Sequence, residues 1–281
     1  MDRRQFGKAA IGSAIVGSAG GLGLSTRAYA EDVLARVKKS GELKVGTETA
    51  FAPFDFVDGG EHKGLNVDLF AELGKDMGLK INWVALPWES VLPGLEAGKF
   101  DMVAGPATIT KARMERYRFS PPIAEATVAL LKHAGDTSIM KPEDIAGKTT
   151  GAGKATAQLE QLKTYIATLP NKQGEVREYV GYNEAYADLA AKRIVAVANS
   201  LPNIAYVAAQ RPDTFEVVQP AFGLKTYFGY IGRKDADYAP LMDAIDAVII
   251  KMKGDGRLAA MQKKWFGLAF ETPNKIDTPN V

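Results

Sequence analysis

The sequence predicts an α/β fold with mostly parallel strands. Short apolar runs alternate with longer amphipathic runs from about residue 33 to residue 266. Alternation of strands and helices is typical of parallel sheets, because parallel neighbours need a crossover between them. The pattern reaches about residue 134 and restarts at about residue 148, which predicts two lobes divided near 134–137 and 223–226.

The first set of elements follows residue 30. Val67, Phe70 and Leu73 recur at helical spacing, and Gly78 is a helix stop, so the segment before it is an amphipathic helix. By the same criteria we expect helices over Val33–Ser40, Leu65–Met77, Ser90–Ala97 and from Thr110, and strands over Glu42–Thr47, Ile81–Leu86, Met102–Gly105 and Val128–His133.

The second set repeats this pattern. We expect strands over Lys148–Gly153, Val176–Val180, Ile194–Asn199 and Phe215–Gln219, with helices over Ala155–Thr168, Asn183–Ala191 and Pro202–Gln210. A strand over Tyr227–Lys234 and helices over Ala239–Lys253 and Asp255–Phe266, broken at Gly254, complete the chain. The proline-containing tail after Phe270 is expected to fray.

Residues 1–30 have the pattern of a cleavable export signal. A basic start precedes the glycine-diluted apolar stretch Ala9–Leu24, and Ala28–Ala30 fits a small-x-small cleavage site before Glu31. Arg3-Arg4 resembles a twin-arginine signal, and an ordinary secretion signal with a chance arginine pair is the alternative. The chain has no cysteine to carry a lipid anchor, so we expect a protein free in the periplasm.

Composition narrows the classes of partner. The full chain has a formal charge of +2, and the first thirty residues account for the excess with Arg3, Arg4, Lys8 and Arg27 against Asp2. A nearly neutral remainder argues against a nucleic-acid partner. Two histidines and no cysteine form no metal-ligand cluster, and Gly151–Thr156 lacks the spacing of a phosphate loop. No cofactor is therefore expected.

The segment from Asp101 to Pro121 is the most informative candidate site. A buried strand leads through a small-residue turn at Gly105 to a helix that starts at Thr110, with Arg113 in its first turn. A helix N-terminus offers unpaired N–H groups and a positive partial charge, and a guanidinium beside it suits a carboxylate. A surface arginine paired with a nearby glutamate, Glu115, is the alternative.

Seven stretches occur in the order and spacing of a known family. They are Glu42–Phe54, Gly64–Leu69, Trp88–Lys99, Ile109–Arg113, Phe119–Pro122, Gly254–Leu258 and Lys264–Gly267. Over about residues 40–268 the chain resembles a family 3 extracellular solute-binding protein, the receptor of an amino-acid-type ABC importer. The resemblance implies a two-lobe periplasmic binding protein of type II-like topology, with two hinge crossings and a ligand cleft between lobes. Lobe 1 would be 31–134 plus 226–281, and lobe 2 would be 135–225.

The function implied by the resemblance is binding and not catalysis. The protein would capture a small carboxylate-bearing solute, either an amino acid or an amino-acid derivative or conjugate. Lobe closure is then a population shift driven by ligand contacts to both lobes. The closed form, expected to be a monomer, would deliver the solute to an inner-membrane permease with its ATPase.

The resemblance also implies a set of site residues. Arg113 matches the arginine that grips the ligand carboxylate, Thr108 a hydroxyl residue that assists it, and Gly105 a backbone contact. Thr156 and Ala157 match the lobe 2 loop that caps the same carboxylate.

Three further residues match the side-chain part of the pocket. Phe51 and Trp88 match its apolar walls, and Glu48 matches a position that reads the head group of the ligand. The alternatives are core positions for the two aromatics, a solvent-facing Glu48, and a role for Thr156 as a helix cap alone.

Departures from the family pattern concern the ligand's amino group. Asn199 and Ser200 stand where amino-acid binders usually place an aspartate for the α-ammonium, and a buried ammonium without a counter-ion costs several kcal/mol. Pro106 removes one N–H donor, and Ala155 replaces a family glycine. We therefore expect a carboxylate ligand without an ordinary free α-amino group, with Glu48 as the partner of another cationic group.

Two other functions remain open at this stage. Some periplasmic dehydratases of prephenate-like acids resemble the same family, and Glu48 is the one cleft carboxylate available as a general acid. A sensory protein that docks on a membrane receptor would have the same ligand site as an importer component.

Overall fold

The computed structural model describes residues 32–171 and 173–281, and its strands form three sheets. The expected export signal at 1–30 lies outside the described residues. The first sheet has the order β5-β1-β6-β14-β7, with β8 also paired to β14. Its strands are β1 (Glu42–Thr47), β5 (Lys80–Ala85), β6 (Met102–Thr108), β7 (Tyr117–Phe119), β8 (Ala124–Glu125) and β14 (Tyr227–Arg233).

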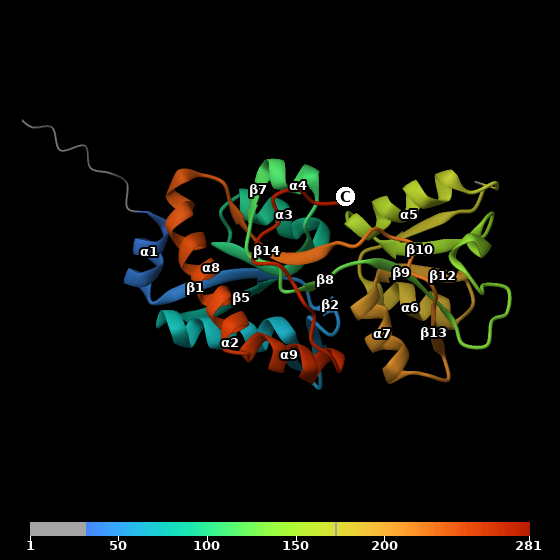
Figure 1. The fold of residues 1–281 in the computed structure, drawn as a ribbon, viewed down its shortest axis with the longest axis horizontal. Helices are drawn as coiled ribbons and strands as arrows, with labels where there is room; N and C mark the ends of the chain where they lie inside the picture. The colour runs from blue at the N-terminus through green and yellow to red at the C-terminus, as the bar shows by residue number, and fades with distance from the viewer. Residues whose placement is uncertain (1–31, 172) are drawn as a thin grey trace, which may run out of the picture. The chain divides into compact units, whose positions relative to one another are not determined.

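Helices cover both faces of the first sheet (Figure 1). One face carries α2, α8 and α9, and the opposite face carries α3. The alternation of β6 explains this, because Met102 and Ala104 enter one apolar cluster whereas Val103 and Ala107 enter another. The helices of this part are α1 (Val33–Ser40), α2 (Leu65–Met77), α3 (Trp88–Glu96), α4 (Lys111–Arg116), α8 (Ala239–Gly254) and α9 (Arg257–Phe266).

The second sheet has the order β11-β10-β12-β9-β13. Helix α5 packs on one face, and α6 and α7 pack on the other (Figure 1). Its strands are β9 (Val128–His133), β10 (Thr150–Gly153), β11 (Val176–Tyr179), β12 (Ala196–Ser200) and β13 (Phe215–Val218), and its helices are α5 (Ala157–Thr168), α6 (Tyr182–Ala190) and α7 (Leu201–Gln210). Two 3₁₀ turns, η1 (Pro142–Ile145) and η2 (Ala236–Tyr238), complete the regular elements of the described residues.

Strand β9 corrects the expected division of the chain. It pairs antiparallel with both β12 and β13, so residues 128–133 belong to the second sheet and not to a first lobe that ends at 134. The chain crosses between the sheets at Ala126–Thr127, and it returns to the first sheet just before Tyr227. The apolar run of β9 is buried in either sheet, which is why the sequence pattern did not assign it.

Short elements around residue 55 were missed. Strands β2 (Ala50–Phe51), β3 (Asp55–Asp58) and β4 (Glu61–Lys63) form the third sheet, and they are too short and polar for a period-2 pattern. The tail also differs from the expectation of fraying. Asn280 Nδ2 donates to the Lys225 carbonyl at 2.6 Å, and Thr272 Oγ1 donates to the Pro122 carbonyl at 3.1 Å.

A buried polar network fixes the third sheet to the first. Asn66 Nδ2 donates to the Asp55 carboxylate and to the Ala104 carbonyl, the latter at 2.8 Å, and its Oδ1 accepts from Tyr230 Oη at 2.8 Å. His62 Nε2 lies 2.7 Å from the other oxygen of Asp55. This network therefore links β3, α2, β6 and β14 by hydrogen bonds, close to the loop that follows β1.

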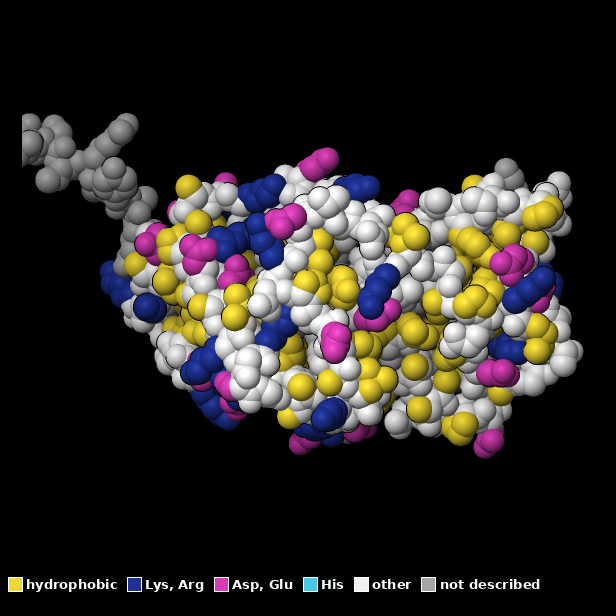
Figure 2. Space-filling view, viewed as in Figure 1, with side chains coloured by type: hydrophobic (Ala, Val, Ile, Leu, Met, Phe, Trp, Pro, Cys, Tyr) yellow, Lys and Arg dark blue, Asp and Glu magenta, His cyan; other side chains and the backbone are white. Residues whose placement is uncertain are grey.

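The surface charges of the described residues are mixed, in agreement with the nearly neutral composition of this part of the sequence. On the face drawn in Figure 2, acidic and basic side chains are interspersed and do not segregate. Many of them form exposed ion pairs, such as Lys163 with Glu178 at 2.8 Å.

We predict that Asn66→Ala lowers the free energy of unfolding by about 3 kcal/mol, because it leaves the buried Asp55 carboxyl and the Tyr230 hydroxyl with fewer partners. Urea unfolding of the ligand-free protein measures this. The control is Asn82→Ala at an exposed position of β5, where a change within about 0.5 kcal/mol is expected. Equal effects of the two substitutions would contradict the role of the network.

Candidate functional site

The expected site residues gather where strands of both sheets end. Glu48 follows β1, Gly105 lies in the middle of β6 and Thr108 at its end, Thr156 follows β10, and Ser200 ends β12. Ligands of α/β sheets bind beyond the carboxyl ends of parallel strands, where side chains and helix N-termini converge. The topology therefore brings together residues that are up to about 150 positions apart in the sequence.

Arg113 is a partly buried cation without a counter-ion. Its Nη1 donates to the Thr108 carbonyl at 3.2 Å, and its guanidinium carbon lies 5.4 Å from the centroid of the Trp88 ring. Burial lowers the pKa of Arg113 to about 10, which still leaves it charged at neutral pH. Within residues 32–171 and 173–281 no carboxylate forms an ion pair with it, so the alternative pairing with Glu115 is absent. Its remaining N–H donors are open to an anion.

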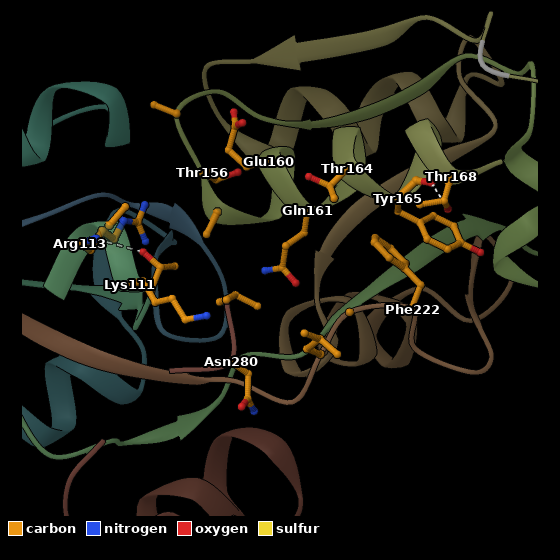
Figure 3. Close-up of a pocket in the computed structure, with 17 residues that line it drawn as sticks. Lys111, Arg113, Thr156, Glu160, Gln161, Thr164, Tyr165, Thr168, Phe222 and Asn280 are labelled. Carbon is orange, nitrogen blue, oxygen red and sulfur yellow. Dashed lines mark hydrogen bonds between the residues drawn. The ribbon is translucent and has the colours of Figure 1, made fainter. Parts of the chain in front are cut away.

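Arg113 lines a cavity, and helix α5 begins on the opposite side of that cavity (Figure 3). Thr156 caps it, because its hydroxyl donates to the Gly153 carbonyl at 2.7 Å and accepts from Leu159 N at 3.1 Å. The first-turn N–H groups of Ala157 and Gln158 have no acceptor among the described residues. Thr156 thus has the capping role, and the unpaired N–H groups of the helix beside Arg113 are what an anion would meet.

Trp88, the first residue of α3, contacts the loop that follows β10 of the second sheet. Its Nε1 donates to the Ala155 carbonyl at 3.2 Å, and Lys154 pairs with Glu89 beside it at 2.7 Å. Ala155 has φ of 58°, a left-handed conformation that glycine adopts at lower cost. Ala155 therefore adopts the backbone conformation of this loop at the cost of some strain.

Gly105 lets Trp88 approach the strand ends. A Cβ atom added at Gly105 would lie 3.3 Å from the indole, which is a tight contact, and 3.6 Å from Glu48 N, which is an ordinary one, so a side chain here would crowd Trp88. Phe51 packs as a core aromatic, with ring centroids 5.8 Å from Phe228 and 5.7 Å from Tyr182 of α6. It therefore links the apolar cores of the two sheets.

Glu48 is a buried acid without a described partner. Its side chain is almost inaccessible, and no hydrogen bond or ion pair to its carboxyl is formed by the residues that the structure describes. Burial, with a smaller effect of the nearby Asp55 charge, raises the pKa of Glu48 from 4.5 to about 8. A solvent-facing Glu48 is thus excluded, and the group is either protonated or in need of a cation.

Asn199 and Ser200 are fully buried, and their side chains are hydrogen-bonded to each other's residues or to neighbouring side chains. Asn199 Nδ2 donates to Tyr186 Oη at 2.9 Å, its Oδ1 accepts from Ser200 N at 2.7 Å, and Gln158 Nε2 donates to Ser200 Oγ at 2.8 Å. No charge is present at this position to hold an ammonium.

Sequence reasoning missed three residues here. Gln158 and Tyr186 provide the partners just described. Asn203 donates to the Ala52 carbonyl at 2.7 Å, and its buried Oδ1 has no partner in the described part of the chain. An asparagine in the first turn of the apolar helix α7 was the available signal.

No group of three or more His, Cys, Asp or Glu side chains in the described ranges could hold a metal ion. No helix among the same residues is both long and apolar enough to cross a membrane.

Comparison with known families decides the class of protein. Residues 43–268 match the family model of bacterial extracellular solute-binding proteins, family 3. The chain belongs to this family. The L-cystine-binding protein TcyJ of Escherichia coli (strain K12) is 30% identical to this solute-binding protein over 249 residues, which are 87% of this chain and 90% of the relative.

Solved structures agree on the fold. An ancestral arginine-binding protein bound to arginine superposes with a TM-score of 0.74 at 30% identity, over 81% of this chain and 99% of that chain. An ancestral amino acid-binding protein, described as a precursor of cyclohexadienyl dehydratase, gives 0.75 at 28% identity, over 83% and 99%. The solute-binding protein thus has the two-lobe α/β fold predicted from its sequence.

We predict that Glu48 makes the stability of the ligand-free solute-binding protein fall as pH rises. Between about pH 4.5 and 8 the folded state keeps a proton that the unfolded chain releases, so the free energy of unfolding falls by up to about 1.4 kcal/mol per pH unit. Glu48→Gln removes this contribution. Urea unfolding from pH 5.5 to 8.5 measures the difference in slope between the two proteins.

The control is Glu115→Gln at an exposed position, which should retain the slope of the unmodified protein. Parallel stability curves for the unmodified protein and Glu48→Gln would show that the buried carboxyl does not hold its proton.

Proposed function

We propose that this protein is the periplasmic substrate-binding component of an ABC importer for a small carboxylate-bearing solute. The solute is an amino acid or an amino-acid derivative, captured by closure of the two lobes and passed to an inner-membrane permease with its ATPase. In this proposal residues 1–30 are the export signal, and the mature protein acts in the periplasm as a monomer.

The observation that carries the proposal is the unpaired Arg113 guanidinium facing the unpaired N–H groups of α5. A partly buried cation is stabilised by an anion, and the two sets of donors lie on α4, which packs on the first sheet, and on α5, which packs on the second. A carboxylate held by both would stabilise the closed arrangement, because only that arrangement supplies both sets of donors. The relatives support the solute class, since cystine and arginine, named for two of them, are both amino acids.

The amino end of the solute is where this chain differs. Neither Asn199 nor Ser200 offers a negative charge, whereas Glu48 is buried without a partner. We propose that the solute has no ordinary free α-amino group and that a cationic group elsewhere in it pairs with Glu48. Binding would then release the proton that Glu48 carries in the free protein.

Closure in this proposal bends the chain at its two crossings. Ala126 N donates to the Thr226 carbonyl at 2.8 Å, and Gly223 N donates to the Val128 carbonyl at 3.0 Å, so the crossings run side by side. We assign residues up to the first crossing and after the second to one lobe, and the residues between them to the other.

We predict that Arg113→Met raises the Kd for the solute at least about 100-fold, because it removes the charged partner of the carboxylate. The solute is found by thermal unfolding of the refolded, ligand-stripped protein against proteinogenic amino acids, N-substituted amino acids and prephenate. A solute at about 1,000 times its Kd adds roughly 4 kcal/mol, and each kcal/mol raises Tm by about 2–4 °C.

The matched control is Arg116→Met, since Arg116 lies one turn further on and pairs with Glu96 on the surface at 2.5 Å. Unchanged affinity in Arg113→Met would refute the carboxylate site. Tight binding of a plain α-amino acid would refute the part of the proposal that concerns the amino group.

A dehydratase is the second candidate. A buried carboxyl with a pKa of about 8 is protonated at neutral pH, as a general acid must be, and an ancestral neighbour is described as a precursor of such an enzyme. Incubation with prephenate or arogenate tests it. Loss of the hydroxyl and the ring carboxylate from either substrate would establish catalysis, and unchanged substrate would leave binding as the function.

A further inference from the structure

A cavity extends from the expected carboxylate site toward the crossing. Its volume is about 770 Å³, within the range of about 300–1,000 Å³ that small-molecule sites occupy. Figure 3 shows Arg113 and Thr156 at one end and Tyr165 with Phe222 at the other. An α-amino acid with its carboxylate at Arg113 would leave most of this space unfilled, so the cavity has room for a second part of the solute.

Two unpaired donors face this space from opposite walls. Lys111 of α4 and Gln161 of α5 both point into the cavity (Figure 3). The Lys111 ammonium forms no ion pair or hydrogen bond within the described part of the chain, although its backbone N–H is held by the Val281 carbonyl at 2.8 Å. Gln161 Nε2 is buried and has no acceptor among residues 32–171 and 173–281.

The pair of donors selects a carboxylate. An ammonium and an amide N–H offer one charged and one neutral hydrogen bond, and a carboxylate can accept both. A buried donor left without an acceptor costs about 1–3 kcal/mol, so an acceptor at Gln161 removes a penalty that the empty cavity retains. Glu160, in the first turn of α5, also lines the cavity, so the preference for a carboxylate comes from the two donors and not from a net positive charge.

The far end of the cavity is apolar. The rings of Tyr165 and Phe222 stack with centroids 4.6 Å apart and an interplanar angle of 27°, and Leu224 is 61% exposed beside them. These side chains offer a surface to the hydrocarbon part of a solute, and they have no charge that would compete for its carboxylate.

We propose that Lys111 and Gln161 form a second carboxylate subsite, and that the solute is an amino acid whose nitrogen carries a carboxyalkyl group. This inference rests on the proposed function, because it takes the first carboxylate to be at Arg113. A secondary ammonium between two carboxylates is neutralised within the solute itself, so it needs no aspartate from the protein. The same chemistry accounts for the uncharged Ser200.

The test compares parent amino acids with their derivatives in titration calorimetry on the ligand-stripped protein. The probes are arginine, lysine, glutamine and methionine, each as the free amino acid and as its N-(1-carboxyethyl) derivative. We expect one derivative to bind at least 10-fold more tightly than its parent. Lys111→Met should weaken that derivative about 10-fold and Gln161→Leu about 5-fold, and both should change the Kd of any parent that binds by less than twofold.

Lys163→Met is the matched control, because Lys163 lies on α5 outside the cavity and pairs with Glu178 at 2.8 Å; it should change neither Kd. Urea unfolding of each variant confirms that it is folded. Equal weakening of parent and derivative by Lys111→Met, or a derivative that binds no more tightly than its parent, overturns the second subsite while dependence on Arg113 keeps the proposed function. Absence of binding by every probe overturns the subsite proposal, and an additional absence of any response in the wider carboxylate panel overturns both.

Discussion

The architecture depends on one constraint, the pair of adjacent crossings by which the chain passes between its two sheets. The segment before β9 and the segment before β14 are joined by backbone hydrogen bonds, and Leu201 N donates to the Thr127 carbonyl at 2.8 Å beside them. Because both crossings lie together, the strand ends of the two sheets face one another. Every contact across the site, including that from Trp88 to Ala155, requires this arrangement.

The site combines charges that the fold does not neutralise. Arg113 and Glu48 are both shifted toward their neutral forms by burial, and neither has an opposite charge from the described residues. The other buried charged side chains of the described residues, Asp55, Asp101 and Lys132, each lie in an ion pair. In the function we propose, this difference separates groups that stabilise the fold from groups that bind the solute, because an unpaired buried charge costs stability that binding can return.

Local patterns predicted most of the helices and strands, since periodicity and glycine stops depend on neighbours within a few residues. They also singled out Arg113 as a candidate, because a guanidinium beside a helix N-terminus suits a carboxylate, and the structure adds that no described carboxylate pairs with it. They failed for β9, whose apolar run would be buried in either sheet, and for the short strands near Asp55, which are held by hydrogen bonds to distant residues. The same limit explains why Gln158, Tyr186 and Asn203 were missed.

The sequence by itself determined the α/β class, the family and the order of the residues that reach the strand ends. Only the tertiary structure decided which of those residues are still available to a ligand. Asn199 and Ser200 have partners that the sequence does not show, Thr156 acts as a helix cap, and Glu48 is buried. Hydrogen bonding and burial depend on groups brought close by folding, so no local pattern could have distinguished them.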